Sequence, residues 1–214
     1  MKRVRPATWL LLVASLAIVS LVAIARGAVP ISLGGAFDAL RGVGDMTAIA
    51  IVRDLRLPRV LLGALVGAGL GASGAALQGS LRNPLAEPYL LGVSGGAAVG
   101  AVLAFSLGAG SDAVITLAAF AGGIGAVFVA LGVARAGGRS VRADLRTLLI
   151  AGVIVGAFAN AAIMVALASA EPNTVRGALW WMMGSAADAT WTRVAWLGAS
   201  IATAGAALLY WARE

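Results

Sequence analysis

The most restrictive feature of this sequence is a set of six long apolar stretches that contain no charged residue. A bilayer hydrocarbon core of about 30 Å is crossed by about 20 apolar residues in an α-helix. Membrane-spanning β-strands would instead alternate apolar and polar residues over about ten positions, and the sequence shows no such alternation. We therefore predict an all-α, polytopic transmembrane bundle that forms one domain over residues 1–214. Its expected spans are 8–25, 60–81, 90–107, 113–134, 147–168 and 194–212, of which 90–107 is rather short.

Composition excludes several classes of function. The 214 residues are 61% hydrophobic and 12% charged, whereas soluble domains have about 45–50% and about 25%. The absence of Cys and His from the sequence excludes a disulfide scaffold, a thiol enzyme, a Ser-His-Asp triad and a His- or Cys-ligated metal site. The sequence also lacks a phosphate-binding loop of the form Gly-x-x-x-x-Gly-Lys-Ser/Thr. We expect no catalytic residue, no metal, no cofactor and no ATP hydrolysis by this chain.

The net charge of +7 is distributed as in loops beside a bilayer, which argues against a nucleic-acid partner. Basic residues precede the first span, and the densest group of arginines lies in the loop at 135–146. Because basic residues accumulate in cytoplasmic loops, we expect the N-terminus to be cytoplasmic. Segments 26–59 and 169–191 then lie on the outer side. We expect one surface helix over 47–57 and a second, tryptophan-bearing one that enters the sixth span.

Glycine and alanine recur at three- and four-residue spacing in several spans. The glycines are Gly63, Gly67, Gly71 and Gly74, then Gly92, Gly95, Gly96 and Gly100, then Gly122, Gly125 and Gly132. Small residues allow helix backbones to approach closely inside a bilayer. The pattern predicts tight packing for most of them, and a minority can line a translocation path.

The segment from Gln78 to Gly92 predicts a turn between two spans. Pro84 disfavours the α conformation at the residue before it, so the second span should end near Arg82. Asn83 can close the turn by a hydrogen bond to its own backbone. We expect Glu87 to cap the next helix or to pair with Arg82.

Four polar side chains at membrane depth in the expected spans are candidates for a role, namely Ser73, Gln78, Ser94 and Asn160. Hydrogen bonding between helices is one role for them. Contact with a solute on a translocation path is the other role, for Gln78, Ser94 and Asn160.

Several strings in the first half of the chain resemble one family. They are Arg56-Leu-Pro-Arg59, Gln78-Gly79, Arg82-Asn83-Pro84-Leu-Ala-Glu87-Pro88 and Leu91-Gly92-Val-Ser-Gly95, with weaker likeness at 149–153 and 179–184. The chain resembles the membrane permease subunits of bacterial ABC importers for iron–siderophore complexes, haem and vitamin B12.

The resemblance implies a bacterial inner-membrane transport subunit. Such permeases have about ten helices and work as homodimers or paired halves. They are driven by two cytoplasmic ATPase subunits and receive substrate from a periplasmic or lipid-anchored binding protein. In the family, basic residues on the outer rim meet acidic residues of the binding protein, and Arg56 and Arg59 occupy the matching positions here. Anchoring at phosphate headgroups is the alternative role for this pair.

The resemblance also exposes a departure. The family continues into a cytoplasmic coupling helix and about four more spans, whereas this sequence ends at Glu214, before that helix would begin. A fragment or a truncated gene is the expectation, and transport by this polypeptide alone is then not expected.

Two other classes remain open. A secondary transporter usually carries an ionisable residue inside a span, and the six expected spans have none. A non-transporting structural membrane fragment is the third possibility.

Overall fold

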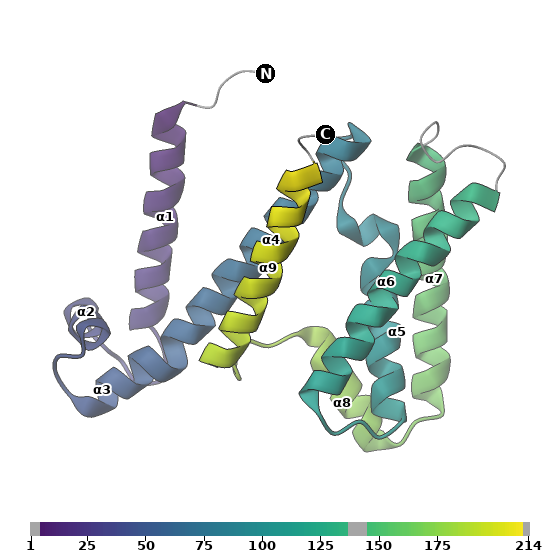
Figure 1. Cartoon of the computed structure of the whole chain (residues 1–214). Helices are drawn as coiled ribbons and strands as arrows, with labels where there is room; N and C mark the ends of the chain where they lie inside the picture. The colour runs from purple at the N-terminus through teal and green to yellow at the C-terminus, as the bar shows by residue number, and fades with distance from the viewer. Residues whose placement is uncertain (1–4, 137–144, 212–214) are drawn as a thin grey trace. The chain divides into compact units, whose positions relative to one another are not determined.

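A computed structural model describes residues 5–136 and 145–211 (Figure 1). Every regular element in these two ranges is a helix, which confirms the predicted all-α class. The α-helices are α1 Pro6–Ala25, α2 Leu33–Arg41, α3 Met46–Ala50, α4 Leu57–Leu81, α5 Val93–Ser106, α6 Asp112–Ala136, α7 Leu145–Ala168, α8 Pro172–Met183 and α9 Trp191–Trp211. A π-helical segment, η1 Ile51–Arg56, separates α3 from α4, and a 3₁₀ turn, η2 Pro88–Leu91, precedes α5.

Five of these helices are long and apolar enough to cross a bilayer, and α5 is a shorter apolar helix. The span expected at 90–107 is therefore corrected at its start. Residues up to Leu91 form the 3₁₀ turn, and Gly92 adopts a left-handed conformation (φ +77°) before α5 begins. The 14 residues of α5 extend about 21 Å at 1.5 Å per residue, which is less than the hydrocarbon thickness of about 30 Å.

The chain separates into two compact units, whereas its sequence predicts one domain over residues 1–214. Unit 1 comprises residues 1–70 and 186–214, and unit 2 comprises residues 71–185.

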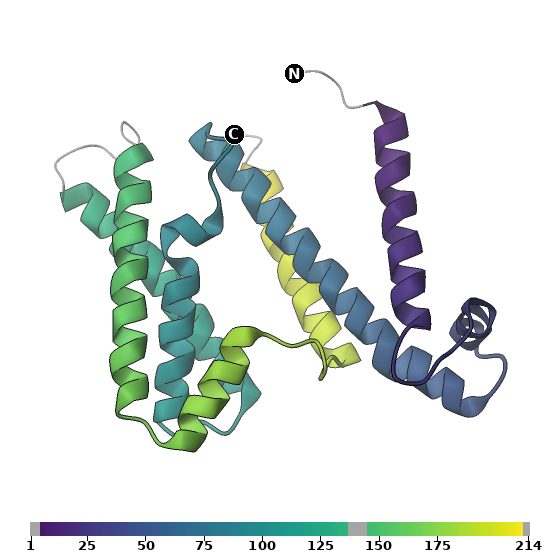
Figure 2. The ribbon, with the colours of Figure 1, turned by 180° about the vertical axis from the view of Figure 1, so that it is seen from behind.

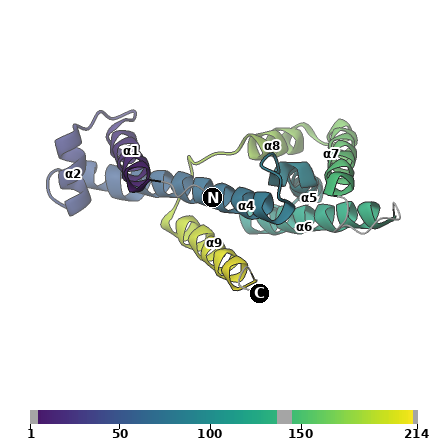
Figure 3. The same cartoon turned by 90° about the horizontal axis from the view of Figure 1, so that it is seen from above.

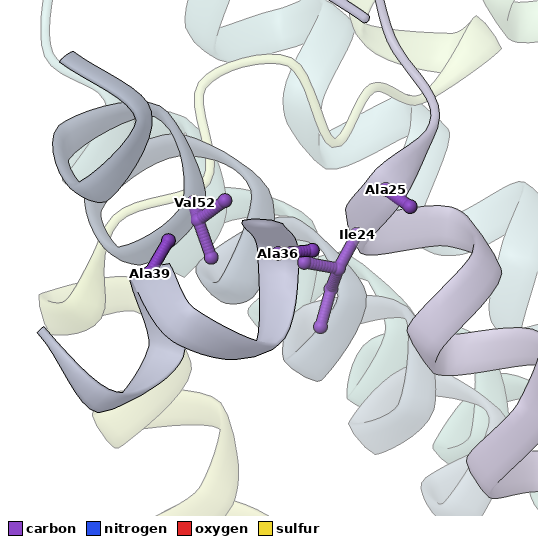
Figure 4. Packing of buried hydrophobic residues seen from close by; sticks show 5 residues of the cluster. All are labelled: Ile24, Ala25, Ala36, Ala39 and Val52. Carbon is purple, nitrogen blue, oxygen red and sulfur yellow. The ribbon is translucent and has the colours of Figure 1, made fainter. Parts of the chain in front are cut away.

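In unit 1, a small core joins the end of α1 to α2 and to the π-helical segment. Its buried residues come from these three elements (Figure 4), and they are Ile24, Ala25, Ala36, Ala39 and Val52. The side chain of Ser32 accepts a hydrogen bond from the Gly35 amide at the start of α2. Gly42, with φ +81°, ends that helix in the left-handed conformation that glycine adopts without strain.

The surface helix expected over 47–57 is helical but is not a separate element. Residues Met46–Leu81 form one uninterrupted helix that includes the π-helical segment. Asp45 caps its start by accepting a hydrogen bond from the Ala48 amide at 2.9 Å. Residues 47–57 contain no glycine or proline, and the helix also continues through Pro58 into the span.

In unit 2, α5 is the central helix. It packs against α6 on one side and against α7 and α8 on the other (Figure 3). Helix α8 crosses α5 and α7 near one end of both (Figure 2), where Ala178 packs with Val102 and Ile163. The second expected surface helix is thus present as α8, but it ends at Gly184 (φ +71°) and does not continue into α9.

The predicted tight packing of glycines is found between α5 and α6. A methyl group added to Gly100 would overlap the carbonyl oxygen of Ala118, and one added to Gly96 or Gly122 would overlap the opposing backbone. In α4, by contrast, a methyl group on Gly63 or Gly67 would meet no atom of the described chain within 4 Å.

The basic residues on which the predicted orientation chiefly rests, including Lys2, Arg3, Arg139 and Arg142, lie outside the described residues. The cytoplasmic N-terminus therefore stays a prediction.

Candidate functional site

The two arginines predicted to dock a binding protein occupy different environments in unit 1. Arg56 is the last residue of the π-helical segment, and its side chain is only 8% exposed. Arg59 lies one turn further along, in α4, and is exposed. The pair therefore divides into an interior and a surface cation.

Arg56 binds the end of α1. Its Nη1 donates to the carbonyl oxygens of Ile24 at 2.7 Å and Ala25 at 2.9 Å, and its Nη2 donates to the carbonyl of Val29. The last carbonyls of a helix have no partner within the helix, and leaving them unpaired near a bilayer is costly. A positive charge at this end also complements the helix dipole. The guanidinium thus closes α1 and fixes the chain that follows it.

The backbone at Gly27 makes room for this guanidinium. A methyl group there would lie 2.7 Å from Nη2 and 2.9 Å from Cζ of Arg56. The absence of a side chain at residue 27 is therefore part of the same arrangement.

Arg59 reaches the segment before α9. Its Nε and Nη2 both donate to the carbonyl oxygen of Ala187, at 3.1 and 2.7 Å. The indole Nε1 of Trp191 donates to the carbonyl of Arg53 at 3.2 Å, so a second bond joins the same two segments. The sequence alone does not predict this bond, because nothing local relates two residues so far apart in the chain.

The predicted turn after α4 is confirmed in detail. Helix α4 ends at Leu81, and Arg82 adopts φ +47°. The amide of Asn83 donates to the carbonyl of Gln78 at 3.1 Å, and that of Arg82 donates to Gly79 at 3.3 Å. These are the two bonds of a Schellman motif, which satisfies the free carbonyls of a helix end.

Asn83 then closes the turn as expected, since its side-chain oxygen accepts a hydrogen bond from the Leu85 amide at 3.0 Å. Both interactions expected of Glu87 are absent among the described residues. Glu87 stands at the N-cap of the 3₁₀ turn without a side-chain bond, and it forms no ion pair with Arg82.

Gly92 ends the motif at a close approach to α7. Its φ of +77° is accessible to glycine at low energy, and a methyl group there would lie 3.1 Å from the Gly152 carbonyl oxygen. The segment of Pro84 and Pro88 is thereby held between α4 and the packed helices of unit 2.

The three side chains predicted for a translocation path, Gln78, Ser94 and Asn160, are all exposed in unit 2. Ser94 and Asn160 are the chain neighbours of Gly95 and Ala159, and a methyl group on Gly95 would lie 3.0 Å from the Ala159 Cβ. The two polar residues thus flank a contact between α5 and α7. Gln78 lies in the last turn of α4.

Unit 2 also has an open apolar hollow of about 900 Å³ between α5, α6 and α7. Its walls are small and apolar side chains, with Leu103, Val155 and Phe158 among the larger ones. No residue of its lining is charged, so it offers shape but no ionic recognition.

The fold and these contacts define a multi-pass, all-α membrane protein in which Arg56 closes α1 and a Schellman motif closes α4. Residues 15–214 match the FecCD transport family, and the chain belongs to that family. The resemblance noted in the motifs is thereby confirmed.

Named relatives are permeases of import systems. The chain is 40% identical over 168 residues to the cobalamin import system permease protein BtuC of Halobacterium salinarum, covering 78% of this chain and 44% of the relative. It is 37% identical over 194 residues to the vitamin B12 import system permease protein BtuC of Shigella boydii, covering 88% and 55%. It is 34% identical over 195 residues to the Fe(3+)-citrate import system permease protein YfmE of Bacillus subtilis, covering 90% and 57%. The chain thus spans about half the length of these relatives.

A solved structure shares the fold. It is described as an inward-facing conformation of an ABC transporter of metal-chelate type, and it matches with a TM-score of 0.79 at 24% identity. The match covers 96% of this chain and 62% of the other.

Proposed function

We propose that this chain supplies membrane-spanning helices of an ABC-importer permease that carries an iron chelate, haem or cobalamin across the bacterial inner membrane. The observation that supports this most is the family match over residues 15–214, together with relatives whose names specify cobalamin and Fe(3+)-citrate import. The proposed partners are cytoplasmic ATPase subunits, a substrate-binding protein and a second permease subunit. ATP hydrolysis is assigned to the partner chains.

The test is uptake in the host. Deleting the gene should abolish uptake of radiolabelled cobalamin, haem or one ferric chelate, and expression of the gene from a plasmid should restore it. Uptake should stop when ATP is depleted and should persist when the proton gradient is collapsed with ATP maintained. Uptake that depends on the proton gradient alone would support a secondary transporter. Unchanged uptake of every substrate after deletion would leave a structural role.

We propose that Arg56 and Arg59, the predicted docking pair, have different roles. Arg59 is exposed and can form a charge-assisted hydrogen bond with a carboxylate of the binding protein. Arg56 is engaged with three carbonyls of its own chain, so it contributes by positioning the segment that presents Arg59.

Arg59→Glu should weaken association with the binding protein about tenfold, because an attraction becomes a repulsion at an exposed contact. The effect should grow as salt is lowered. The affinity can be measured by surface plasmon resonance on permease in nanodiscs, with Arg41→Glu as the control for a general change of charge. Equal affinities of Arg59→Glu and wild type at low salt would contradict this assignment.

We propose that Gln78, Ser94 and Asn160 line the solute path, supported by their exposure on unit 2. Replacing Asn160 by Leu should then lower the uptake rate while leaving the amount of protein in the membrane unchanged.

A further inference from the structure

Unit 1 contains a hollow of about 780 Å³ between α1 and the start of α4. One end is lined by three arginines, Arg26, Arg56 and Arg59, and the rest by apolar and small residues that include Leu16, Val19 and Gly63. We call it the α1–α4 hollow. Since α1 ends at Ala25 and α4 begins at Leu57, the charged end lies where one helix leaves the apolar layer and the other enters it.

The charged end has no acidic counterpart. None of the residues that line the hollow is Asp or Glu. Arg56 and Arg59 donate to carbonyl oxygens, which are neutral, so no acidic side chain of the lining pairs with either of them. The Arg26 side chain has no hydrogen bond or ion pair with any described residue. The dipole of α1 offsets only about half an elementary charge. The end therefore attracts an anion.

The remainder of the hollow suits a hydrocarbon chain. Leu16 precedes Arg26 by ten positions, which corresponds to about 15 Å along an α-helix. Val19 and Ala23 from α1 face the same space as Val60, Gly63 and Ala64 from α4. A small inorganic anion would contact the arginines and leave the apolar part of the hollow unoccupied. A carboxylate on a soluble protein would likewise have no use for a hollow that runs into the membrane layer.

We infer that the α1–α4 hollow binds an anionic phospholipid. The phosphate sits beside Arg26, in the field of the buried Arg56 cation, and one acyl chain lies along Leu16, Val19 and Gly63. Interfacial arginines attract anionic headgroups in general. Here the apolar walls of the hollow and the fixed Arg56 cation make a defined site. This inference does not depend on the proposed transport function, and Arg26 has no part in the proposed docking of a binding protein.

The test uses the full 214-residue chain in nanodiscs of equal amounts of phosphatidylglycerol and phosphatidylcholine. Bound lipid is counted by native mass spectrometry after release from the disc. Arg26→Gln removes one cation. Gly63→Leu adds apolar volume to the same part of the hollow, and a methyl group on Gly63 meets no atom of the described chain within 4 Å.

Two matched variants serve as controls. Arg41 is an exposed arginine of the same unit that lies over the ring of Phe37, 4.2 Å from its centroid, outside the hollow. Gly67 is an equally open glycine of α4 that does not line the hollow. Arg41→Gln and Gly67→Leu therefore reproduce the chemistry of the two test changes at other positions.

We expect phosphatidylglycerol retained by the wild type to fall about fivefold in Arg26→Gln, the effect of one interfacial cation, and at least as much in Gly63→Leu. Both controls should retain the wild-type amount. Wild-type retention in both test variants, or equal loss in the controls, would overturn the inference. Displacement of the lipid by inorganic phosphate alone would also overturn it, because it would identify a site for a free anion.

Discussion

Two glycine-rich helices of this protein behave differently, although their sequences are alike. In α5, Gly96 and Gly100 contact the backbone of α6 so closely that no side chain fits. In α4, Gly63 and Gly67 face open space within unit 1. The spacing of small residues therefore shows where a second helix can approach closely. Whether a helix lies there depends on the rest of the fold.

The two units also differ in how much of their apolar surface they bury themselves. In the most apolar stretches of α6 and α7, 28% and 22% of residues are buried, against 6% in α1 and none in α4. Unit 2 is held by side-chain and backbone packing. Unit 1 combines a small apolar core with arginine side chains that bind backbone carbonyls, so the two units should respond to different substitutions.

The largest effect is expected at the α5–α6 contact. Gly100→Ala would place its methyl group against the carbonyl oxygen of Ala118. The methyl carbon is attached directly to one helix backbone and the oxygen to the other, so the two helices must separate. We expect a loss of about 3 kcal/mol in the free energy of unfolding, measured by SDS titration followed by circular dichroism. The control, Gly67→Ala, should be neutral or stabilising because alanine has the higher helix propensity. Equal losses in the two variants would contradict the difference drawn between these helices.

The next effect concerns the arginines of unit 1. Arg56→Gln removes a buried cation that binds three carbonyls and should destabilise unit 1 by about 2 kcal/mol. Limited proteolysis should then cut the segment between α1 and α2 faster. Arg59→Gln removes bonds to one carbonyl at an exposed position, and we expect no more than about 1 kcal/mol. The idea that Arg56 holds α1 fails if the two variants are cut at the same rate.

The smallest effect is expected at the turn after α4, and it has the opposite sign. Arg82 adopts φ +47°, which disfavours a residue with a side chain by about 1 kcal/mol or more. Arg82→Gly should therefore raise the free energy of unfolding by about 1 kcal/mol. Asn83→Ala should instead lower the free energy of unfolding, because it removes the hydrogen bond that the Leu85 amide donates to the Asn83 side chain. A destabilised Arg82→Gly variant would show that the arginine side chain makes a contribution that the turn geometry does not explain.

Local chemistry made much of this structure predictable. The end of α4 at Leu81 and the Asn83 turn follow from a proline and its preceding residue, and both depend on neighbours in the chain. The long spans follow from runs of apolar residues. The start of α5 was predicted too early because the 3₁₀ turn before it also consists mainly of apolar residues, so hydrophobicity alone does not separate the two elements.

The roles of the arginines were not predictable in the same way. Arg56 binds carbonyls 27 to 32 residues earlier in the chain, and Arg59 binds one 128 residues later. Composition and spacing describe which residues can bear charge at a membrane surface. Composition and spacing do not show which backbone carbonyls the fold brings within reach of an arginine. For that reason the same role was predicted for Arg56 and Arg59.

The π-helical turn at Ile51–Arg56 has a consequence for how the segment tolerates changes in length. A turn of this kind accommodates about one more residue than an α-helical turn. Deleting one residue from it would therefore restore ordinary helix with little rotation of what precedes it, whereas deleting one from the first turn of α4 would rotate everything before the deletion by about 100°. The core of Val52, Ala36 and Ala39 would then turn away from Val60, which packs against it. The π-helical segment can thus lose a residue with less effect on this packing than the α-helix that follows it.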